Sequence, residues 1–340
     1  MKVTNKILIT GAAGFIGFHL SKRLISKNID VYGIDNLNDY YDRTLKDSRL
    51  EELQKFSKKH KGQFYFTKLD LANRDNLYQY MAKNNFTVII NLAAQAGVRH
   101  SIDNPHSYVD SNLLGFMNIL ESSRRLSVSH FIFASSSSVY GMNNKVPFSV
   151  GDNTDYPISL YAATKKSNEL MAHSYSHLYD LPVTGLRFFT VYGPFGRPDM
   201  AYYKFTKNVI LGKPIDVFND GKMKRDFTYV DDVIEGITRI VNKVPKKSKS
   251  KISNAKAPYK IYNIGNNNPV ELDRFIKSIE TATGIKSIRN NLPMQAGDVP
   301  VTFADVDDLV SEINFKPETS IEDGISQFVD WYKSFMKKNE

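Results

Sequence analysis

Tyr161 and Lys165, four residues apart, are the side chains of this sequence best suited to acid–base chemistry. They lie in a segment with helical periodicity, residues 161–179, so both are expected to project from one face of a helix. A free tyrosine has a pKa near ~10 and is a poor base at neutral pH. A neighbouring lysine ammonium favours the phenolate. The pair therefore predicts a general acid/base.

Consecutive serines, Ser135–Ser138, add a hydroxyl to this set. They close the predicted strand 131–135, and the carboxyl ends of parallel strands are where doubly wound sheets bind ligands. A tyrosine–lysine pair at this spacing is common by chance. The same pair downstream of a serine-ended strand is a more specific signal of a catalytic site.

Three glycines, Gly11, Gly14 and Gly17, stand between a predicted strand at 7–10 and a predicted helix at 15–26. Glycines in this context allow a tight turn and a close approach of the backbone to a pyrophosphate, which then faces the helix N-terminus. The spacing GxxGxxG differs from the standard GxGxxG. The strand before the turn and the helix after it nevertheless favour a dinucleotide site over a plain strand-to-helix turn.

Asp35 follows the second predicted strand and lies eighteen residues beyond Gly17, close to the ~20 expected for the acid that binds an adenosine ribose. A carboxylate there accepts from the ribose 2′-hydroxyl and repels a 2′-phosphate. The following residues, Asn36-Leu37-Asn38, include no arginine. This pattern favours NAD over NADP, and the alternative is an ordinary aspartate in a turn.

The elements that must position these residues alternate between strand and helix. Strands are predicted at 7–10, 31–34, 64–69, 88–92, 131–135 and 183–188, and helices at 15–26, 71–83, 108–125 and 161–179. This alternation predicts an α/β fold with a doubly wound, Rossmann-type parallel sheet. The charged run 38–61 is an insertion with helical character.

Beyond residue 190, prolines and glycines interrupt the pattern, and helices are predicted at 231–241, 272–283 and 323–335, with one strand at 261–264. We therefore divide the chain into an NAD-binding Rossmann domain, 1–189, to which 229–264 returns, and a smaller domain, 190–340, that binds the substrate.

The composition, with 340 residues, 41% hydrophobic and 24% charged, is that of a globular protein. The absence of cysteine excludes thiol nucleophiles, disulfides and cysteine metal sites. No apolar run is long enough for a secretory signal or a membrane span, which favours the cytoplasm.

The net charge is +9, and five lysines lie close together within residues 243–251. We interpret this segment as a solvated loop. A nucleic-acid site is not favoured there, because no aromatic residue lies between the lysines. His173 and His177 have a zinc-compatible spacing but no third ligand, so we predict no metal.

Motifs spread over nearly the full length resemble the extended short-chain dehydrogenases/reductases, in their nucleotide-sugar epimerase and dehydratase branch. They are GAAGFIG from Gly11, NLAAQAGVRHS from Asn91, SSSSVYG from Ser135, YAATK from Tyr161, LRFFTVYGPFGRPDMA from Leu186, RDFTYVDDV from Arg225 and GDVPVTFADVDDL from Gly297. Within this branch, GIDNLNDYYD from Gly33, GPFGRPDMA and PMQAGDVP resemble the UDP-glucuronate 4-epimerases most closely.

The resemblance implies a role for each matching residue. Tyr161 is the acid/base, Lys165 is its electrostatic partner and a ligand of the nicotinamide ribose, and Ser136 is the catalytic hydroxyl, with Ser137 and Ser138 kept as alternatives. The implied cofactor-binding residues are Gly11, Gly14, Phe15, Ile16, Gly17, Asp35, Asn36, Asp70, Leu71, Leu92, Ala93, Ala94, Asn112, Tyr161 and Lys165.

The resemblance also implies substrate contacts from Thr190, Arg225 and Asp298. A further candidate is Arg197, the one strongly charged side chain of the loop 192–198. Arginine pairs with a carboxylate in a bidentate way, so Arg197 could bind the carboxylate of a uronate. It could equally bind the UDP diphosphate or a surface carboxylate.

The implied function is NAD-dependent 4-epimerisation of UDP-glucuronate to UDP-galacturonate through a transient 4-keto intermediate, by a homodimer that pairs helices 108–125 and 161–179 across a two-fold axis. Dehydratases and decarboxylases of the branch that this chain resembles carry a carboxylate next to or near the catalytic Ser or Thr. The serine stretch here contains no Asp or Glu, so the resemblance does not extend to the elimination of water. Two alternatives remain. One is a 4-epimerase of a neutral UDP-hexose or its N-acetyl form, and the other is a non-catalytic NAD- or RNA-binding protein on the same fold.

Overall fold

The computed structural model describes residues 6–247, 256–294 and 301–339. Over these residues the chain forms two compact units. Unit 1 is drawn from Met1–Asn143, Asp152–Arg187 and Ile234–Tyr262, and unit 2 from Asn144–Gly151, Phe188–Val233 and Asn263–Glu340. The sequence-based division differs in detail, since 144–151 falls in unit 2 and the chain returns to unit 1 at Ile234.

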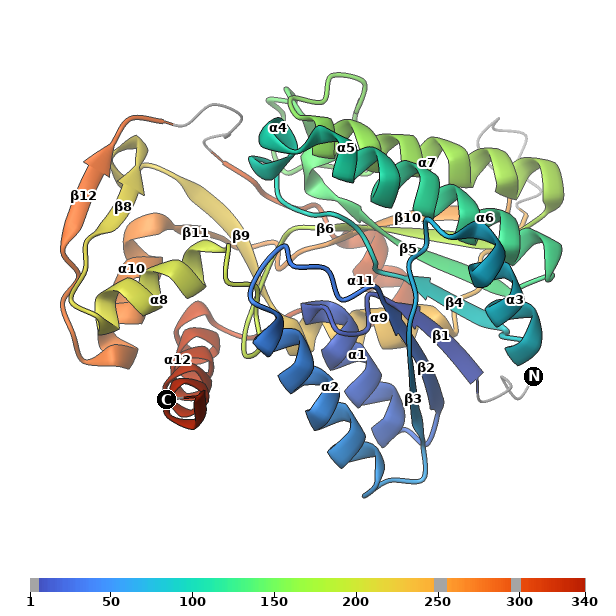
Figure 1. Cartoon of the computed structure of the whole chain (residues 1–340). Coiled ribbons are helices and arrows are strands. Elements are labelled where there is room, and N and C mark those ends of the chain that lie inside the picture. The colour runs from blue at the N-terminus through green and yellow to red at the C-terminus, as the bar shows by residue number, and fades with distance from the viewer. Residues whose placement is uncertain (1–5, 248–255, 295–300, 340) are drawn as a thin grey trace. The chain divides into compact units, whose positions relative to one another are not determined.

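Unit 1 is built on a seven-stranded sheet with the order β10-β6-β5-β4-β1-β2-β3 (Figure 1). Its strands are β1 Lys6–Thr10, β2 Asp30–Asp35, β3 Phe64–Lys68, β4 Val88–Asn91, β5 His130–Ser136, β6 Val183–Phe188 and β10 Tyr259–Ile264. β1 pairs in parallel with both β2 and β4, and the pairs β2–β3 and β4–β5 are also parallel. The strand order reverses between β1 and β4, which is the switch point where doubly wound sheets bind ligands. The predicted fold class is confirmed.

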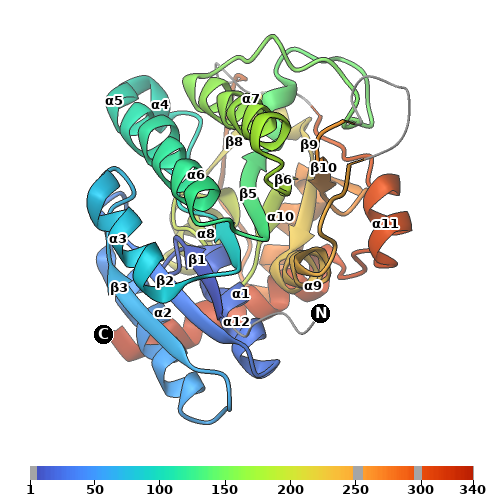
Figure 2. The ribbon, with the colours of Figure 1, turned by 90° about the vertical axis from the view of Figure 1, so that its right-hand side faces the viewer.

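Helices cover both faces of this sheet (Figure 2). α1 Phe15–Ser26 and α2 Arg43–Ser57 lie on one face, and α3 Arg74–Asn84, α6 Gly115–Arg125 and α7 Leu160–Tyr179 lie on the other. α9 Val230–Val241 is joined to α1 by an ion pair of 3.1 Å between Arg23 and Glu235. Strand side chains are fully buried between these layers, among them Ile7, Ile9, Ile90 and Phe131. Apolar runs that are buried on both sides are typical of parallel strands.

The predicted helix 108–125 has a more complex form in the structure. The short helices α4 His100–Asp103 and α5 Pro105–Tyr108 lead into a π-helical segment, Val109–Leu114, which continues as α6. π-helical turns inside helices often occur at functional sites. This one contains Asn112, a predicted cofactor residue, whose side chain is buried.

Unit 2 has two small sheets. β7 Thr190–Tyr192, β9 Lys224–Tyr229 and β11 Pro269–Glu271 form one, in the order β11-β9-β7, and β8 Ile215–Phe218 pairs in parallel with β12 Arg289–Leu292 in the other. The accompanying helices are α8 Ala201–Ile210, α10 Leu272–Thr283, α11 Asp307–Ile313 and α12 Ile321–Asn339.

The core of unit 2 is aromatic, with Tyr192, Tyr202, Phe275 and Phe328 almost completely buried. Gly324 belongs to this packing, because a Cβ there would lie 2.3 Å from the Tyr192 hydroxyl oxygen. Aromatic side chains bury large areas and pair edge to face, as Tyr202 and Phe328 do with ring centroids 5.0 Å apart. This cluster holds α12 against β7 and α8.

Candidate active site

The turn after β1 has glycine at the positions where its backbone folds back on itself. Gly14 donates its N–H to the Gly11 carbonyl at 2.9 Å, and a Cβ on Gly17 would lie only 2.2 Å from that same oxygen. Gly11 has φ +70°, a conformation that glycine adopts readily. Phe15 and Ile16 begin α1, and the N–H groups of the first turn of a helix have no acceptor within that helix. This geometry suits an anion at the helix N-terminus.

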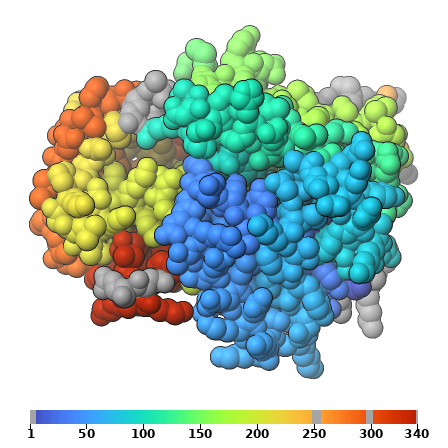
Figure 3. All heavy atoms as spheres, viewed as in Figure 1, coloured from blue at the N-terminus to red at the C-terminus, as the bar shows by residue number. Residues whose placement is uncertain are grey.

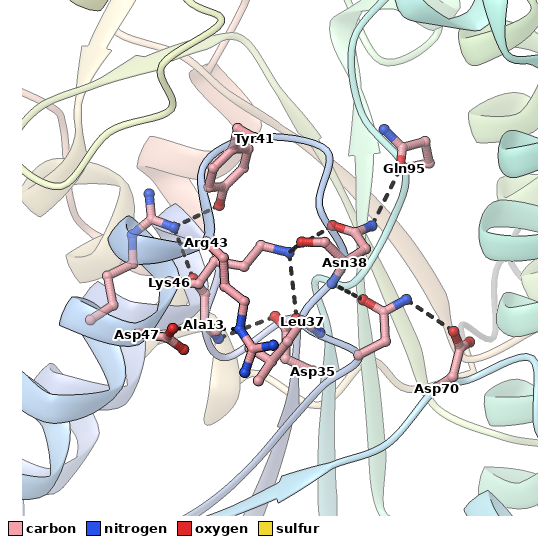
Figure 4. Close-up of polar contacts among 12 residues, drawn as sticks. Ala13, Asp35, Leu37, Asn38, Tyr41, Arg43, Lys46, Asp47, Asp70 and Gln95 are labelled. Carbon is pink, nitrogen blue, oxygen red and sulfur yellow. Dashed lines mark hydrogen bonds and ion pairs between the residues drawn. The ribbon is translucent and has the colours of Figure 1, made fainter.

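Asp35 ends β2 next to the glycine turn (Figure 4). Its carboxylate accepts N–H groups from Ala13 at 3.2 Å and from Leu37 at 2.8 Å. The neighbouring Asn36 side chain donates to the Asp70 carboxylate at 3.0 Å. An open hollow of ≈ 640 Å³ adjoins Asp70 and is lined also by Leu114 and Asn118. The side chains predicted for the adenosine half of a dinucleotide thus lie together in unit 1.

The segment after β4 is tied to β1 and to the π-helical segment. The Ala93 N–H donates to the Thr10 hydroxyl at 3.0 Å, and Leu92 donates to the Thr10 carbonyl at 3.3 Å. Asn112 exchanges two hydrogen bonds with the Gln95 backbone, of 2.8 and 3.0 Å, and donates to the Thr164 hydroxyl at 3.1 Å. These bonds fix the segment with the predicted cofactor residues Leu92, Ala93 and Ala94 between the glycine turn and α7.

The catalytic candidates lie on α7 and at the end of β5. The Ser159 hydroxyl caps α7 by accepting the Ala162 N–H at 3.1 Å, so Tyr161 falls in the first turn. Lys165 is buried, and its ammonium donates to the Ala134 carbonyl of β5 at 2.9 Å. Burial lowers the pKa of Lys165 to about 8. The predicted pair thus lies on α7, with Lys165 bonded to β5 and the Tyr161 ring packed edge-on against Tyr108 at 6.1 Å.

The serines differ in what they contact. The Ser135 hydroxyl donates to Glu169 at 2.6 Å, whereas Ser136 caps the 3-10 turn Ser137–Tyr140 by accepting the Ser138 N–H at 3.1 Å. A hydroxyl that accepts a backbone N–H keeps its own proton available to donate. Ser136 therefore fits the role of a hydroxyl donor, and Ser137 and Ser138 are both partly exposed beside it.

The predicted substrate residues belong to unit 2. Thr190 of β7 is paired with Phe227 of β9, two residues from Arg225, so these two candidates lie on adjacent strands. Arg197 binds Asp199 through its Nε at 3.0 Å and a second nitrogen at 2.5 Å. Its backbone N–H donates to Tyr202 at 2.9 Å. Asp298 lies outside the described residues.

Residues 7–265 match the model of the NAD dependent epimerase/dehydratase family. The chain belongs to this family. The match spans the whole sheet of unit 1 except the first residue of β1, together with the glycine turn and α7.

Individual members of the family are similar over nearly the full length. The chain is 55% identical to Protein CapI of Staphylococcus aureus, over 98% of this chain and 100% of that protein. It is 48% identical to a probable UDP-glucuronate 4-epimerase of Rhizobium meliloti, over 96% of each chain. The crystal structure of a UDP-glucuronic acid 4-epimerase from Bacillus cereus, in complex with UDP-glucuronic acid and NAD, matches with a TM-score of 0.86 at 32% identity, covering 97% of this chain and 99% of that one.

Two cations of α2 that lie near the predicted cofactor residues were not predicted. Lys46 lies 3.8 Å from the Asp35 carboxylate and donates to the Asn38 side chain at 2.7 Å (Figure 4). Arg49 is fully buried and donates to the Ala13 carbonyl at 2.8 Å and to Tyr41 at 2.6 Å. Burial lowers the pKa of Lys46, and the charge of Asp35 partly opposes that effect.

A signal for Arg49 exists in the sequence. It lies four residues from Leu45 and four from Leu53, so it interrupts an apolar helix face. Both leucines are buried, whereas the outward residues of α2 form part of the blue surface in Figure 3. The residues next to Asp35 in the sequence include no cation, and the helix that follows supplies one, Lys46.

His173 and His177 stack with ring centroids 6.4 Å apart, and His173 packs edge-on against Tyr259 at 5.1 Å. Among the described residues, no group of three or more histidine and acidic side chains could hold a metal ion. Likewise, no helix of the described chain is long and apolar enough to cross a bilayer.

Proposed function

We propose that this chain is an NAD-dependent 4-epimerase that interconverts UDP-glucuronate and UDP-galacturonate. The observation that carries the proposal is the Tyr161–Lys165 pair of α7 against β5, in a chain similar over 97% of its length to a UDP-glucuronic acid 4-epimerase. The catalytic set is Tyr161, Lys165 and one serine hydroxyl, for which Ser136 is our first choice.

The residues of unit 1 fit NAD. A Cβ at Gly17 would meet the Gly11 oxygen at 2.2 Å, so the turn leaves bare backbone where a pyrophosphate must approach. In this proposal Gly11, Gly14 and Gly17 hold the pyrophosphate, Asp35 the adenosine ribose, and Lys165 the nicotinamide ribose. The chemistry that NAD supplies when bound is the reversible acceptance of a hydride from carbon 4 of the sugar.

Tyr161 handles the proton. Its phenolate accepts the proton of the sugar 4-hydroxyl and returns it when the 4-keto sugar is reduced on the opposite face. Lys165, whose pKa of about 8 leaves it mostly protonated at neutral pH, stabilises the phenolate through its charge. Ser136 donates a hydrogen bond to the sugar 4-oxygen, which becomes more negative as the hydroxyl proton leaves.

The choice of a uronate rests on Arg197. A planar guanidinium binds carboxylates in a bidentate way, and Asp199 already engages Arg197 in this form. A uronate carboxylate would take the place of Asp199. A bound carboxylate is also held away from the orientation in which a β-keto acid loses carbon dioxide.

The alternative is that Arg197 binds the UDP diphosphate, and one variant distinguishes these two roles. Arg197→Ala should weaken binding of UDP-glucuronate far more than binding of UDP, as measured by calorimetry, and an equal loss for both would assign Arg197 to the phosphates.

The deciding experiment is incubation with UDP-glucuronate and, separately, with UDP-glucose, with the products identified by NMR. The expected result is UDP-galacturonate from the first substrate without added NAD, because the cofactor is regenerated in each cycle. Turnover of UDP-glucose alone would favour the second candidate, a 4-epimerase of neutral UDP-hexoses or their N-acetyl forms. No turnover of either substrate by NAD-loaded protein would favour the remote third candidate, an NAD- or RNA-binding protein, although the retained Tyr161–Lys165 pair speaks against it.

We further propose a cytoplasmic homodimer that binds no nucleic acid. The supporting observation is a set of exposed apolar side chains on the helices that cover one face of unit 1 (Figure 2), namely Val109, Leu114, Leu170 and Leu178. Exposed apolar surface of this kind marks interaction sites. Light scattering at micromolar concentration should give twice the mass of the chain, and the mass of a monomer would contradict the proposal.

A further inference from the structure

A buried ion pair joins α7 and β6 in unit 1. Glu169 of α7 and Arg187 of β6 have side chains only 4% and 5% exposed. The guanidinium binds both carboxylate oxygens, each at 2.8 Å. Burying two charges costs as much as their attraction returns, so such a pair is poor evidence of a purely stabilising role. Its contacts point to another role.

The pair joins the elements that carry the catalytic side chains. Glu169 lies on α7 at four residues from Lys165 and eight from Tyr161, so the three share one helix face. The Ser135 hydroxyl, next to Ser136, donates to the Glu169 carboxylate at 2.6 Å. Arg187 lies 4.9 Å from the ring of Tyr140, the last residue of the 3-10 turn that Ser136 caps. One ion pair therefore sets the register between α7 and the end of β5.

The pair also controls the charge near Lys165. An unpaired carboxylate at position 169 would be within reach of the Lys165 ammonium, as residues four apart on a helix are. Arg187 occupies both oxygens instead, and Lys165 donates to the Ala134 carbonyl. In the described part of the chain, no carboxylate is ion-paired with Lys165. The positive charge of Lys165 thus stays available for Tyr161.

Two tyrosines and a histidine surround the pair. Tyr259 of β10 donates to the Glu169 carbonyl at 3.1 Å, and burial raises the pKa of Tyr259 well above its usual value. Tyr140 faces Arg187, and His173 packs on Tyr259 from the outer side. The balance therefore involves Glu169, Arg187 and Lys165.

We propose that Glu169 and Arg187 form a positioning pair, in which Arg187 neutralises Glu169 so that Lys165 acts on Tyr161 and Ser136 keeps its place at the end of β5. This inference rests on the proposed function for its link to turnover. It adds two positioning residues, which act through Lys165 and through the end of β5, to the description of the site.

The test compares Arg187→Gln, Glu169→Gln and the double variant, each by its pH profile of kcat and its KM. In Arg187→Gln the free carboxylate neutralises Lys165, so Tyr161 loses its electrostatic support. We expect kcat to fall at least tenfold with little change in KM, and the acid limb of the profile to move upward by about one pH unit. Glu169→Gln removes the carboxylate that could neutralise Lys165, so the acid limb of the pH profile of this variant should not move.

The double variant shows whether the pair acts through the charge of Glu169 on Lys165 or only supports the structure. With both charges removed, the acid limb should return to the wild-type position and kcat should recover to within about fivefold. A double variant with the same shifted limb as Arg187→Gln, or with lower activity than either single variant, would overturn the proposal. Arg239→Gln, which breaks a more exposed pair with Glu235 in unit 1, is the matched control and should leave the profile unchanged.

A readout without turnover keeps the inference independent of the proposed function and of a poorly folded variant. In protein with ¹³C-labelled tyrosine, the NMR signal of Tyr161, assigned by its loss in Tyr161→Phe, reports the pKa of this phenol directly. The pKa should rise in Arg187→Gln and return in the double variant. If Arg187→Gln does not fold, the double variant and Glu169→Gln still test the proposal. Both should keep the wild-type pKa of Tyr161, and a rise of this pKa in either variant contradicts the proposal. Absence of turnover by wild-type protein with an intact NMR pattern would reject the proposed function alone.

Discussion

The two units each bury a carboxylate, and they satisfy it in different ways. In unit 1, Glu169 faces an arginine that binds both of its oxygens. In unit 2, Asp226 of β9 is completely buried and accepts backbone N–H groups from Asn266 at 2.8 Å, Asn267 at 3.2 Å and Ala304 at 2.9 Å. One charge is balanced by an opposite charge, and the other by peptide dipoles.

The difference shows in the titration of Asp226. Burial raises its pKa to about 6, although the three N–H groups act in the opposite direction. Peptide dipoles compensate a buried charge less completely than a guanidinium does. The contrast suggests a division of labour. In our proposal the pair in unit 1 keeps a fixed charge pattern for catalysis, whereas Asp226 in unit 2 joins two loops to the strand that carries Arg225.

The largest expected effect tests whether the chemistry belongs to unit 1. Tyr161→Phe removes the proposed acid/base, so kcat should fall by about 10³-fold or more. The midpoint of thermal unfolding and the NAD content should stay nearly unchanged. Tyr65→Phe, at an exposed tyrosine of β3, is the control. Activity of Tyr161→Phe within a few-fold of wild type would remove Tyr161 from the mechanism.

The second prediction compares the two buried carboxylates directly. Arg187→Met leaves Glu169 charged without its partner and should lower the free energy of unfolding by about 3–5 kcal/mol. Asp226→Asn removes the charge and leaves at most one or two N–H groups without an acceptor, at a cost of about 1–3 kcal/mol. Urea unfolding at pH 7 measures both. A larger loss in Asp226→Asn than in Arg187→Met would invalidate the contrast.

The third prediction concerns pH. Because the folded pKa of Asp226 is about 6 and the unfolded value is about 3.9, the folded state binds the proton more tightly. The stability contributed by protonated Asp226 is therefore complete below about pH 4 and is lost as the pH rises through 6. The free energy of unfolding of wild type relative to Asp226→Asn should fall over this range, by up to about 3 kcal/mol. Urea titrations at several pH values between 4 and 7 give this difference, and a flat difference would contradict the assignment.

The smallest effect concerns Asp35, which combines both kinds of partner, with two backbone N–H groups and Lys46 at 3.8 Å. The ammonium reduces the repulsion between Asp35 and a 2′-phosphate. Lys46→Met should therefore weaken NADP relative to NAD, by about fivefold or ~1 kcal/mol. Calorimetry with both cofactors measures the ratio. Lys55→Met, an exposed lysine of α2 paired with Glu51, should leave the ratio as it is.

Several parts of the fold could be predicted from local pattern. The helices 15–26 and 272–283 have the predicted bounds, and the strand at 183–188 does too. Their apolar patterns are strong local signals, and a glycine adjoins each of the two helices, Gly14 before the first and Gly284 after the second. The π-helical segment at Val109–Leu114 was not predicted, since its extra residue per turn is stabilised by contacts of Asn112 with Gln95 and Thr164, far away in sequence.

The same distinction applies to the candidate site. Tyr161, Lys165 and the serines after β5 are identifiable because their spacing on one helix and one strand end is local, and the glycine turn is identifiable because a Cβ has no room there. The balance of charge is not local. Arg187 binds Glu169, Lys46 lies beside Asp35, and Asp226 accepts backbone N–H groups from two distant loops. Each of these contacts joins groups that are far apart in the sequence. The sequence by itself determined which groups can do chemistry, because spacing along a helix or strand sets which residues share a face. The tertiary structure alone decided which charges are paired, because electrostatic energy depends on distance in space and on burial.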